Sequence, residues 1–219
     1  MCAFLADERL QILLGQRGPR ARRERQDDAV RWFAAFATVS AALGAVAFVL
    51  MTPIARLAVV VPIAFALILA GLVYAHQERT TIGEAVSAMT LASVAVPLAV
   101  VSGASMTTAV TCASAFASGF VAAIICVRAV IAHTRYPPGT RSRATAMLIT
   151  LAVLSILVSL RSRGLVASVA PWAAAPLLVG GAALAAVPPS ARQVRIIGWT
   201  LVVTTAATSL VLIAALRYY

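Results

Sequence analysis

Long apolar stretches separated by short groups of charged residues dominate the pattern along this chain. Six stretches contain no charged residue, and they run from Arg31 to Arg56, Arg56 to Glu78, Glu84 to Arg128, Arg143 to Arg161, Arg163 to Arg192 and Arg195 to Arg217. Each can hold the roughly 17–25 apolar residues that a membrane-spanning helix needs. The pattern therefore predicts an all-α fold, a polytopic transmembrane helical bundle.

The stretch between Glu84 and Arg128 decides how many spans the bundle has. As one helix its 43 residues would be about 64 Å long, twice the hydrocarbon thickness, so the chain must turn inside it. Ser102–Gly103–Ala104–Ser105 is the turn-like cluster within this stretch. Seven spans follow, at Val30–Met51, Leu57–Ala75, Ile82–Val101, Met106–Ile131, Ala144–Leu160, Leu165–Val187 and Val194–Leu216.

The distribution of arginine tests this count and orients the chain. With seven spans, 14 of the 18 arginines fall on one side of the membrane and four on the other. If the long stretch were a single crossing, the split would fall to 11 against seven. Because cytoplasmic loops carry the excess of positive charge, we predict a multi-pass protein of the cell (plasma) membrane. Its N-terminus is expected in the cytoplasm and its C-terminus outside.

Composition supports lipid rather than water as the solvent of this chain. Hydrophobic residues make up 62% and charged residues 11%, and the mean hydropathy is +0.96, whereas soluble domains are about 45–50% apolar. The net charge of +11 comes wholly from arginine, and such a charge would also suit a nucleic-acid binder. Since the arginines fall in loops on one predicted side, we expect the lipid bilayer as partner and no nucleic acid.

Residues 1–29 form a polar segment that precedes a predicted seven-helix transmembrane domain at residues 30–219. Phe4–Leu14 predicts a short amphipathic helix, ended by Gly15 and Gly18–Pro19. A signal peptide would place basic residues before an apolar core, and the order here is reversed. We therefore expect a cytosolic, arginine-rich segment that contacts anionic lipid at the membrane surface. The residues that make this contact are predicted to be Arg20, Arg22, Arg23 and Arg25.

Four ionisable residues gather at one predicted membrane interface. Glu84 opens the third span, Arg128 lies in the last turns of the fourth, His76 ends the second, and His133 follows the fourth. On the predicted topology they form a candidate polar site at the cytoplasmic face, where Glu84 and Arg128 can pair across antiparallel helices. The functional interpretation is the mouth of a substrate or proton pathway. The structural interpretation is a helix cap, a snorkelling arginine and two solvated histidines.

Two local patterns predict how helices begin and how they pack. Thr81 and Glu84 have the spacing of a capping box, which predicts Thr81 as the cap of the third span. Small residues recur every four positions in Ser114–Ser118–Ala122 and in Thr200–Thr204–Thr208. Such rows let helices approach closely, so they predict packing faces rather than a pore lining.

Known catalytic motifs are absent from the sequence. It contains no Gly-rich phosphate loop, no His-Glu-x-x-His pattern and no nucleophile elbow. Asp27–Asp28 begins like an acidic motif that binds a diphosphate through Mg²⁺, but Arg31 stands where the next acid is needed. Cys2, Cys112 and Cys126 lack the spacing of a metal site. We predict no cofactor and no metal ligand, and the sequence leaves open whether the protein is an enzyme.

Three segments resemble YwiC-like integral membrane proteins. They are Phe4–Gly18 with Arg22–Arg23–Glu24, then Thr81–Glu84 with the following helix to Pro97, and Arg192 through Ile196–Ile197–Gly198–Trp199. The family's N-terminal Lys-Glu-His-Gly segment is missing, and Asp7–Glu8–Arg9 replaces its Asn-Glu-Pro-like turn. The resemblance implies that residues 1–14 are the remnant of a preceding helix. With two more helices the count would be nine, as in UbiA-like prenyltransferases, whose aspartate-rich motifs this chain lacks.

These observations leave three hypotheses about function. The first is a non-enzymatic membrane protein that binds or moves a small apolar or anionic solute. The second is a degenerate member of a lipid- or isoprenoid-processing fold, with an apolar lipid or quinone held between helices kinked at Pro97 and Pro176. The third is a passive subunit that binds a membrane-protein partner through its Ser/Thr faces.

Overall fold

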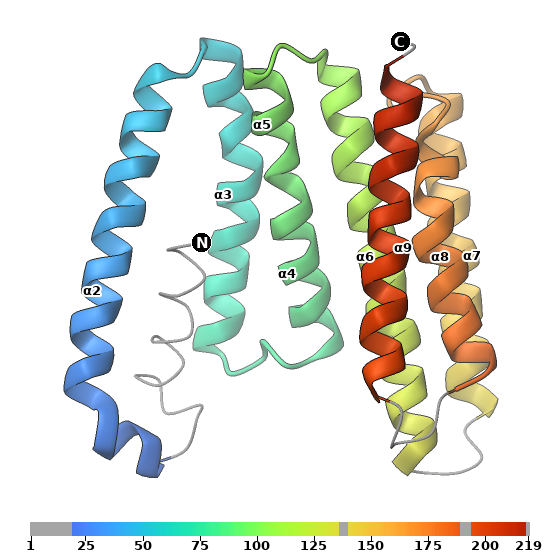
Figure 1. Ribbon diagram of the computed structural model, residues 1–219, viewed down its shortest axis with the longest axis horizontal. Helices are drawn as coiled ribbons and strands as arrows, with labels where there is room; N and C mark the ends of the chain where they lie inside the picture. Colours follow the sequence, from blue (N-terminus) through green and yellow to red (C-terminus); the bar gives the residue numbers. More distant parts are fainter. Residues whose placement is uncertain (1–18, 136–139, 189–193, 218–219) are drawn as a thin grey trace. The chain divides into compact units, whose positions relative to one another are not determined.

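The computed structural model describes residues 19–135, 140–188 and 194–217, and over these residues it contains helices and no strand. The helices are α2 (Pro19–Leu50), α3 (Pro53–Tyr74), α4 (Thr81–Ser93), α5 (Ala95–Val101), α6 (Met106–Arg135), α7 (Thr140–Ser162), α8 (Ala170–Ala186) and α9 (Val194–Leu216) (Figure 1). The prediction of an all-α bundle is confirmed.

Six helical segments of the described chain are long and apolar enough to cross a membrane. They are Gln26–Leu50, Pro53–Tyr74, Thr81–Val101, Met106–Ala132, Ser142–Ser162 and Arg195–Leu216. The remaining predicted span corresponds to α8, which has 17 residues and stands at the short end of the roughly 17–25 needed. α7 ends at Ser162, the chain turns at Gly164, whose φ is +71°, and α8 begins at Ala170 rather than at the predicted Leu165. The chain is a multi-pass membrane protein.

The chain divides at Thr52 into two compact units, residues 1–52 and residues 53–219. In the first unit α2 is one helix of 32 residues, and Trp32 stacks on Phe36 with ring centroids 5.4 Å apart. Pro19 begins α2, since the first helical position tolerates its missing N–H. The backbone of Arg20 to Arg25 lies in this helix, and the predicted amphipathic helix at Phe4–Leu14 lies outside the described residues.

The third span is interrupted once, at Val94 between α4 and α5. Pro97 lies in the first turn of α5 and has no N–H to donate to the carbonyl of Ser93, which explains the interruption at this point. The Ser93 hydroxyl donates to the carbonyl of Thr90 at 2.8 Å. Pro62 and Pro176, in contrast, lie inside α3 and α8 without breaking them.

The turn predicted inside the long charge-free stretch is present. α5 ends at Val101 and α6 begins at Met106, and Gly103 between them has a φ of +88°, a left-handed conformation that glycine adopts without strain. The Ser105 hydroxyl accepts the backbone N–H of Thr108 at 3.1 Å and so caps the start of α6.

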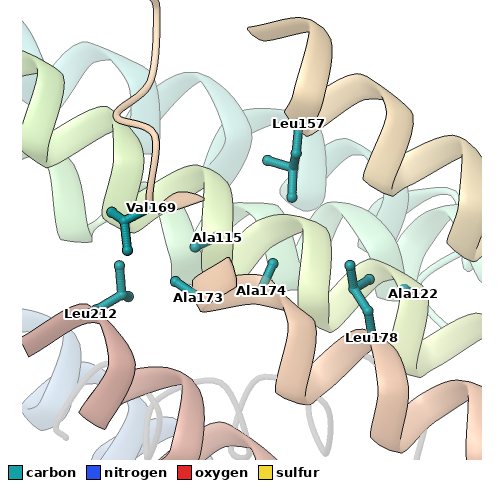
Figure 2. Packing of buried hydrophobic residues seen from close by; sticks show 8 residues of the cluster. All are labelled: Ala115, Ala122, Leu157, Val169, Ala173, Ala174, Leu178 and Leu212. Carbon is teal, nitrogen blue, oxygen red and sulfur yellow. The ribbon is translucent and has the colours of Figure 1, made fainter. Parts of the chain in front are cut away.

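In the unit 53–219, α8 packs against α6, α7 and α9. The largest group of buried apolar residues surrounds it, and Figure 2 shows all eight of them: Ala115 and Ala122 of α6, Leu157 of α7, Val169 before α8, Ala173, Ala174 and Leu178 of α8, and Leu212 of α9. Five of the eight are alanine or valine, so the backbones of neighbouring helices come close together. This is the packing that small residues permit between membrane helices.

Two glycines lie where α8 comes close to its neighbours: Gly119 on α6, which faces α8, and Gly180 on α8, which faces α9. A Cβ on Gly119 of α6 would lie 2.8 Å from the Cβ of Leu177, and a Cβ on Gly180 would collide with the side chain of Thr204 on α9. Ala122 and Thr208, which belong to the two predicted packing rows, are fully buried. The prediction that these rows are packing faces is confirmed at Ala122, Thr204 and Thr208.

A buried hydroxyl ties the connection between α7 and α8 to α6. Thr111 Oγ1 accepts the backbone N–H of Ala167 at 2.8 Å and donates to the carbonyl of Thr107 at 2.7 Å. Thr111 is fully buried, so no water replaces this acceptor. Ala167 lies between α7 and α8, so its N–H has no helical partner, and the hydroxyl of Thr111 provides the acceptor that it needs.

We expect Gly119→Ala to destabilise the protein and Gly71→Ala to leave its stability unchanged or slightly higher. Both changes replace glycine in a helix by the better helix former, but only Gly119 faces a neighbouring side chain, since nothing lies within 4 Å of a Cβ at Gly71. Overpacking costs about 1–3 kcal/mol. Thermal unfolding in detergent, followed by loss of the monodisperse chromatographic peak, should show the lower midpoint for Gly119→Ala. Equal midpoints would contradict the close approach of α6 and α8.

We expect Thr111→Val to lower the midpoint more than Thr90→Val in the same thermal assay. Valine keeps the shape of Thr111 but leaves the N–H of Ala167 without an acceptor, which costs about 1–3 kcal/mol. Among the described residues, the Thr90 hydroxyl bonds to the carbonyl of Val86 in its own helix, at 2.8 Å, so its loss frees no distant donor. A larger effect at Thr90 would show that the bond from Ala167 contributes little.

Candidate functional site

The connection between α3 and α4 begins with a Schellman motif in which His76 takes the position usually held by glycine. His76 has a φ of +55°, its N–H donates to the carbonyl of Val73 at 3.0 Å, and the N–H of Gln77 donates to the carbonyl of Leu72 at 2.8 Å. These two bonds satisfy two carbonyls in the last turn of α3, those of Val73 and Leu72. The backbone of His76 therefore has a structural role, and its side chain is exposed.

The cap of α4 is Thr80 and not Thr81, so the predicted capping box is wrong by one residue. Thr80 Oγ1 accepts the N–H of Gly83 at 3.1 Å and donates to the carbonyl of Gln77 at 2.7 Å. Thr81 is the first residue inside the helix. Glu84 is consequently one position too far along the helix to return a bond to the cap, and its carboxylate is available to another partner.

Gly83 lets the α3–α4 connection lie directly against the first turn of α4. A Cβ at this position would collide with the carbonyl oxygen of Gln77 and would lie 2.6 Å from that of Glu78. Both neighbours are backbone atoms, which cannot turn aside as a side chain can. This contact fixes the backbone of residues 77–79 beside the helix that carries Glu84.

Glu84 and Arg128 form the ion pair that the sequence suggested. Arg128 Nε donates to Glu84 Oε2 at 2.7 Å, and 35% of the arginine side chain and 42% of the glutamate side chain remain exposed. Arg128 Nη2 also donates to the backbone carbonyl of Arg79. One guanidinium thus joins α6 to α4 and to the α3–α4 connection.

The two histidines of the predicted site are not brought into this pair by any described contact. His76 lies in the connection after α3, four residues before the cap of α4. His133 lies on α6, five residues beyond Arg128, and its side chain is outside the description. The site as described therefore consists of Glu84, Arg128 and the carbonyl of Arg79.

A groove of about 860 Å³ opens beside the ion pair, and sequence reasoning did not anticipate it. Its walls come from α4, α6, α8 and α9: Glu84, Ser87, Ala88, Leu91, Phe120, Ala123, Ile124, Val127, Arg128, Ile131, Ala132, Leu177, Leu201 and Thr205. The partial signal in the sequence is on α4, where Ser87 and Leu91 follow Glu84 at helical spacing on one face. The apolar residues of α6 that line the groove are of the same types as residues that face lipid, so they give no signal in the sequence.

The charged groups of the groove stand together near one end. Glu84 and Arg128 are its charged residues. The hydroxyl of Ser87 donates to the carbonyl of Gly83 at 2.9 Å, and that of Thr205 donates to the carbonyl of Leu201 at 2.7 Å. These hydroxyl donors are therefore engaged within their own helices. The rest of the lining is apolar.

The groove extends along about half of the fourth span. Its lining on α6 runs from Phe120 to Ala132, which is about 18 Å at 1.5 Å per residue. The apolar span on α6 is Met106–Ala132, so Phe120 lies near its middle and Arg128 near its end. The groove thus matches the depth of one leaflet of a bilayer about 30 Å thick.

Among the described residues, no group of three or more His, Cys, Asp or Glu side chains lies close enough to hold a metal ion. Cys112 and Cys126 on α6 are free thiols, and Cys126 Sγ lies 3.6 Å from Thr150 Oγ1 on α7. Cys126 is buried in a second apolar cluster with Ala129, Ala146 and Ala185. Its position indicates a role in helix packing.

Comparison with known proteins gives one family. Residues 1–100 match the model of the family described as YwiC-like protein. The matched range contains Thr81 to Glu84 and the helix to Pro97, and it ends before α6, so it includes Glu84 but not Arg128. No curated protein gives a significant match, and no solved structure does either. The resemblance to YwiC-like proteins is thus confirmed over residues 1–100 of this multi-pass membrane protein.

Proposed function

We propose that this membrane protein binds an amphipathic small molecule in the groove between α4, α6, α8 and α9. The apolar part of the ligand lies on the floor formed by α6, and its polar end lies at Glu84 and Arg128. The observation that carries the proposal is the arrangement of the groove, whose charged residues stand together near one end of an otherwise apolar lining. A molecule with an apolar tail and one polar head matches this arrangement.

The size of the groove supports a ligand rather than a packing defect. Its volume of about 860 Å³ falls within the roughly 300–1,000 Å³ of small-molecule sites. Other parts of the same unit pack without such a space, because α6 and α8 touch at Gly119 and Leu177.

Binding is the step that a solute carrier and a lipid-processing enzyme would share. Arg128 and Glu84 supply hydrogen-bond donors and acceptors for a head group. The helix–helix cleft supplies the apolar walls that membrane ligands such as lipids or quinones require. We therefore propose ligand binding in the membrane as the function, ahead of any transport or chemistry that follows from it.

We further propose that the polar end of the groove faces the cytoplasm. In the unit 53–219, the ends of α3, α6 and α8 and the starts of α4, α7 and α9 lie at the same end (Figure 1). Seven of the 11 arginines after residue 53 belong to these helix ends and the connections between them: Arg79, Arg128, Arg135, Arg141, Arg143, Arg192 and Arg195. The positive-inside rule assigns this end to the cytoplasm.

This orientation predicts that a reporter fused after Tyr219 lies outside the cell. Alkaline phosphatase, which is active only after export, should be active in this fusion, and a fluorescent protein that folds only in the cytoplasm should stay dark. A fusion within the α3–α4 connection, after Gln77, should give the opposite pair of results. A fluorescent, phosphatase-negative fusion at Tyr219 would reverse the proposed orientation.

The groove itself predicts that Ile124→Trp displaces the ligand. Ile124 lies on the floor of the groove, so a larger side chain fills part of the space. Purified protein is stripped of lipid, exposed to total lipid extract, washed and weighed by native mass spectrometry. We expect Ile124→Trp to retain at least about fivefold less bound amphiphile than the unchanged protein, a loss of roughly 1 kcal/mol.

The matched control is Val202→Trp on α9. Val202 is 59% exposed and does not line the groove, so this variant places a tryptophan in place of a β-branched apolar residue on an outer surface. It should retain as much amphiphile as the unchanged protein. If both tryptophan variants, or neither, lose the bound molecule, the groove is not its binding site.

A further inference from the structure

We propose that the head of the bound amphiphile is a singly charged oxyanion, a carboxylate or a phosphodiester, held by the N–H groups of Arg128. The inference rests on the proposed function, because it names the head of the molecule whose tail lies in the groove. It distinguishes such a ligand from a neutral alcohol or quinone, from an amine and from a doubly charged phosphate.

Arg128 keeps N–H donors that its bonds to Glu84 and to the carbonyl of Arg79 do not use. A guanidinium carries five N–H groups. Nε donates to Glu84 and Nη2 donates once, to the carbonyl of Arg79. Among the described residues these are the partners of Arg128, so both N–H groups of Nη1 and the second of Nη2 remain for a ligand. Arg128 lines the groove.

The guanidinium of Arg128 is held in place before a ligand arrives. Glu84 holds it from α4, and the carbonyl of Arg79 holds it from the α3–α4 connection. Gly83 in turn fixes that connection against α4. Because two bonds hold the planar guanidinium, its remaining N–H groups point in a fixed direction. Such a pair of parallel donors suits the two oxygens of a carboxylate or phosphodiester. Glu84 is thus a positioning residue.

The charges nearest to Arg128 balance one another. Arg128 is neutralised by Glu84 at 2.7 Å. Arg79 lies 3.9 Å from Glu78, so the four charged side chains described in α4, the α3–α4 connection and the facing part of α6 sum to zero. One negative charge gains charge-assisted bonds to Arg128. A second would meet the repulsion of Glu84, whose carboxylate lies 2.7 Å from Nε of the same guanidinium.

The test compares ligands that share one apolar chain and differ in the head. The delipidated full-length protein in detergent at pH 8 is titrated with radiolabelled oleate, oleyl alcohol, oleylamine and oleyl phosphate, and with 1-oleoyl-lysophosphatidylglycerol as the phosphodiester. We expect oleate or the phosphodiester to bind about tenfold more tightly than the alcohol, the difference that a charge-assisted hydrogen bond provides. The ligand of these two that binds more tightly shows whether the head is a carboxylate or a phosphodiester. Oleyl phosphate should bind no more tightly than oleate.

Variants of Arg128 and Glu84 test whether this ion pair causes the preference for an anionic head. Arg128→Gln should remove the difference between oleate and oleyl alcohol, and Arg161→Gln, at the other end of the unit, should leave it unchanged. Glu84→Gln leaves one positive charge unbalanced, so it should raise the affinity for oleyl phosphate relative to oleate. If Arg128→Gln fails to fold, Arg128→Lys replaces it and should weaken oleate while leaving oleyl alcohol unchanged, since lysine lacks the planar fork.

The outcomes separate this inference from the proposed function. If none of the five ligands binds, and lipid retention is insensitive to Ile124→Trp, the groove is not a ligand site and the proposed function fails. A second outcome is that the ligands bind, that Ile124→Trp weakens their binding, and that oleyl alcohol binds as tightly as oleate. The groove is then a ligand site, and the proposal of an oxyanion head is wrong. Tightest binding of oleylamine, or equal loss of all ligands in Arg128→Gln, would also overturn the role given to Arg128.

Discussion

The absence of water in the hydrocarbon core is the constraint on which this structure depends. Each backbone N–H and C=O at membrane depth needs a partner inside the protein, and helices provide one for nearly every residue. The informative places are those where the helical pattern stops. At Val94 the interruption is placed where Pro97 removes a donor, and before α8 the free N–H of Ala167 is taken up by the buried hydroxyl of Thr111. In the second case a neighbouring helix supplies the acceptor that the regular helical pattern would otherwise provide.

Packing in lipid has to work without much help from the hydrophobic effect, because lipid tails are as apolar as leucine. The unit 53–219 meets this requirement with small residues around α8, so that backbones approach closely and dispersion contacts accumulate. Gly119 and Gly180 are placed where any side chain would collide with Leu177 or Thr204. The same unit leaves a groove where α4 and α9 flank α6. Tight packing on one side of α6 and an open groove on another give the helix two distinct faces.

The sequence was sufficient for features that depend on local pattern. Charge-free stretches predicted the spans, and Ser102–Ser105 marked the turn between α5 and α6. It was insufficient where a distant residue decides between local alternatives. Thr80 and Thr81 both suit a helix cap, and Glu84 appeared to select Thr81, but the carboxylate binds Arg128, 44 positions along the chain. His76 looked like a titratable interface residue, whereas its backbone ends α3 in a conformation that usually calls for glycine. The groove was missed because an apolar residue facing a cavity and one facing lipid have the same sequence signature.

The position of the ion pair explains how a charged site is tolerated so close to the membrane interior. Arginine or glutamate alone at the centre of a span is costly, and breaking a buried pair leaves an uncompensated charge. Arg128 avoids both penalties, because it lies four residues before the end of its apolar span and remains partly exposed beside Glu84. Water can then reach the outer N–H groups when no ligand is present, and an oxyanion can replace that water without stripping solvent from a deeply buried charge. A neutral pair at the rim of an apolar groove therefore keeps the cost of the empty site low while leaving donors that only a ligand with a polar head can use.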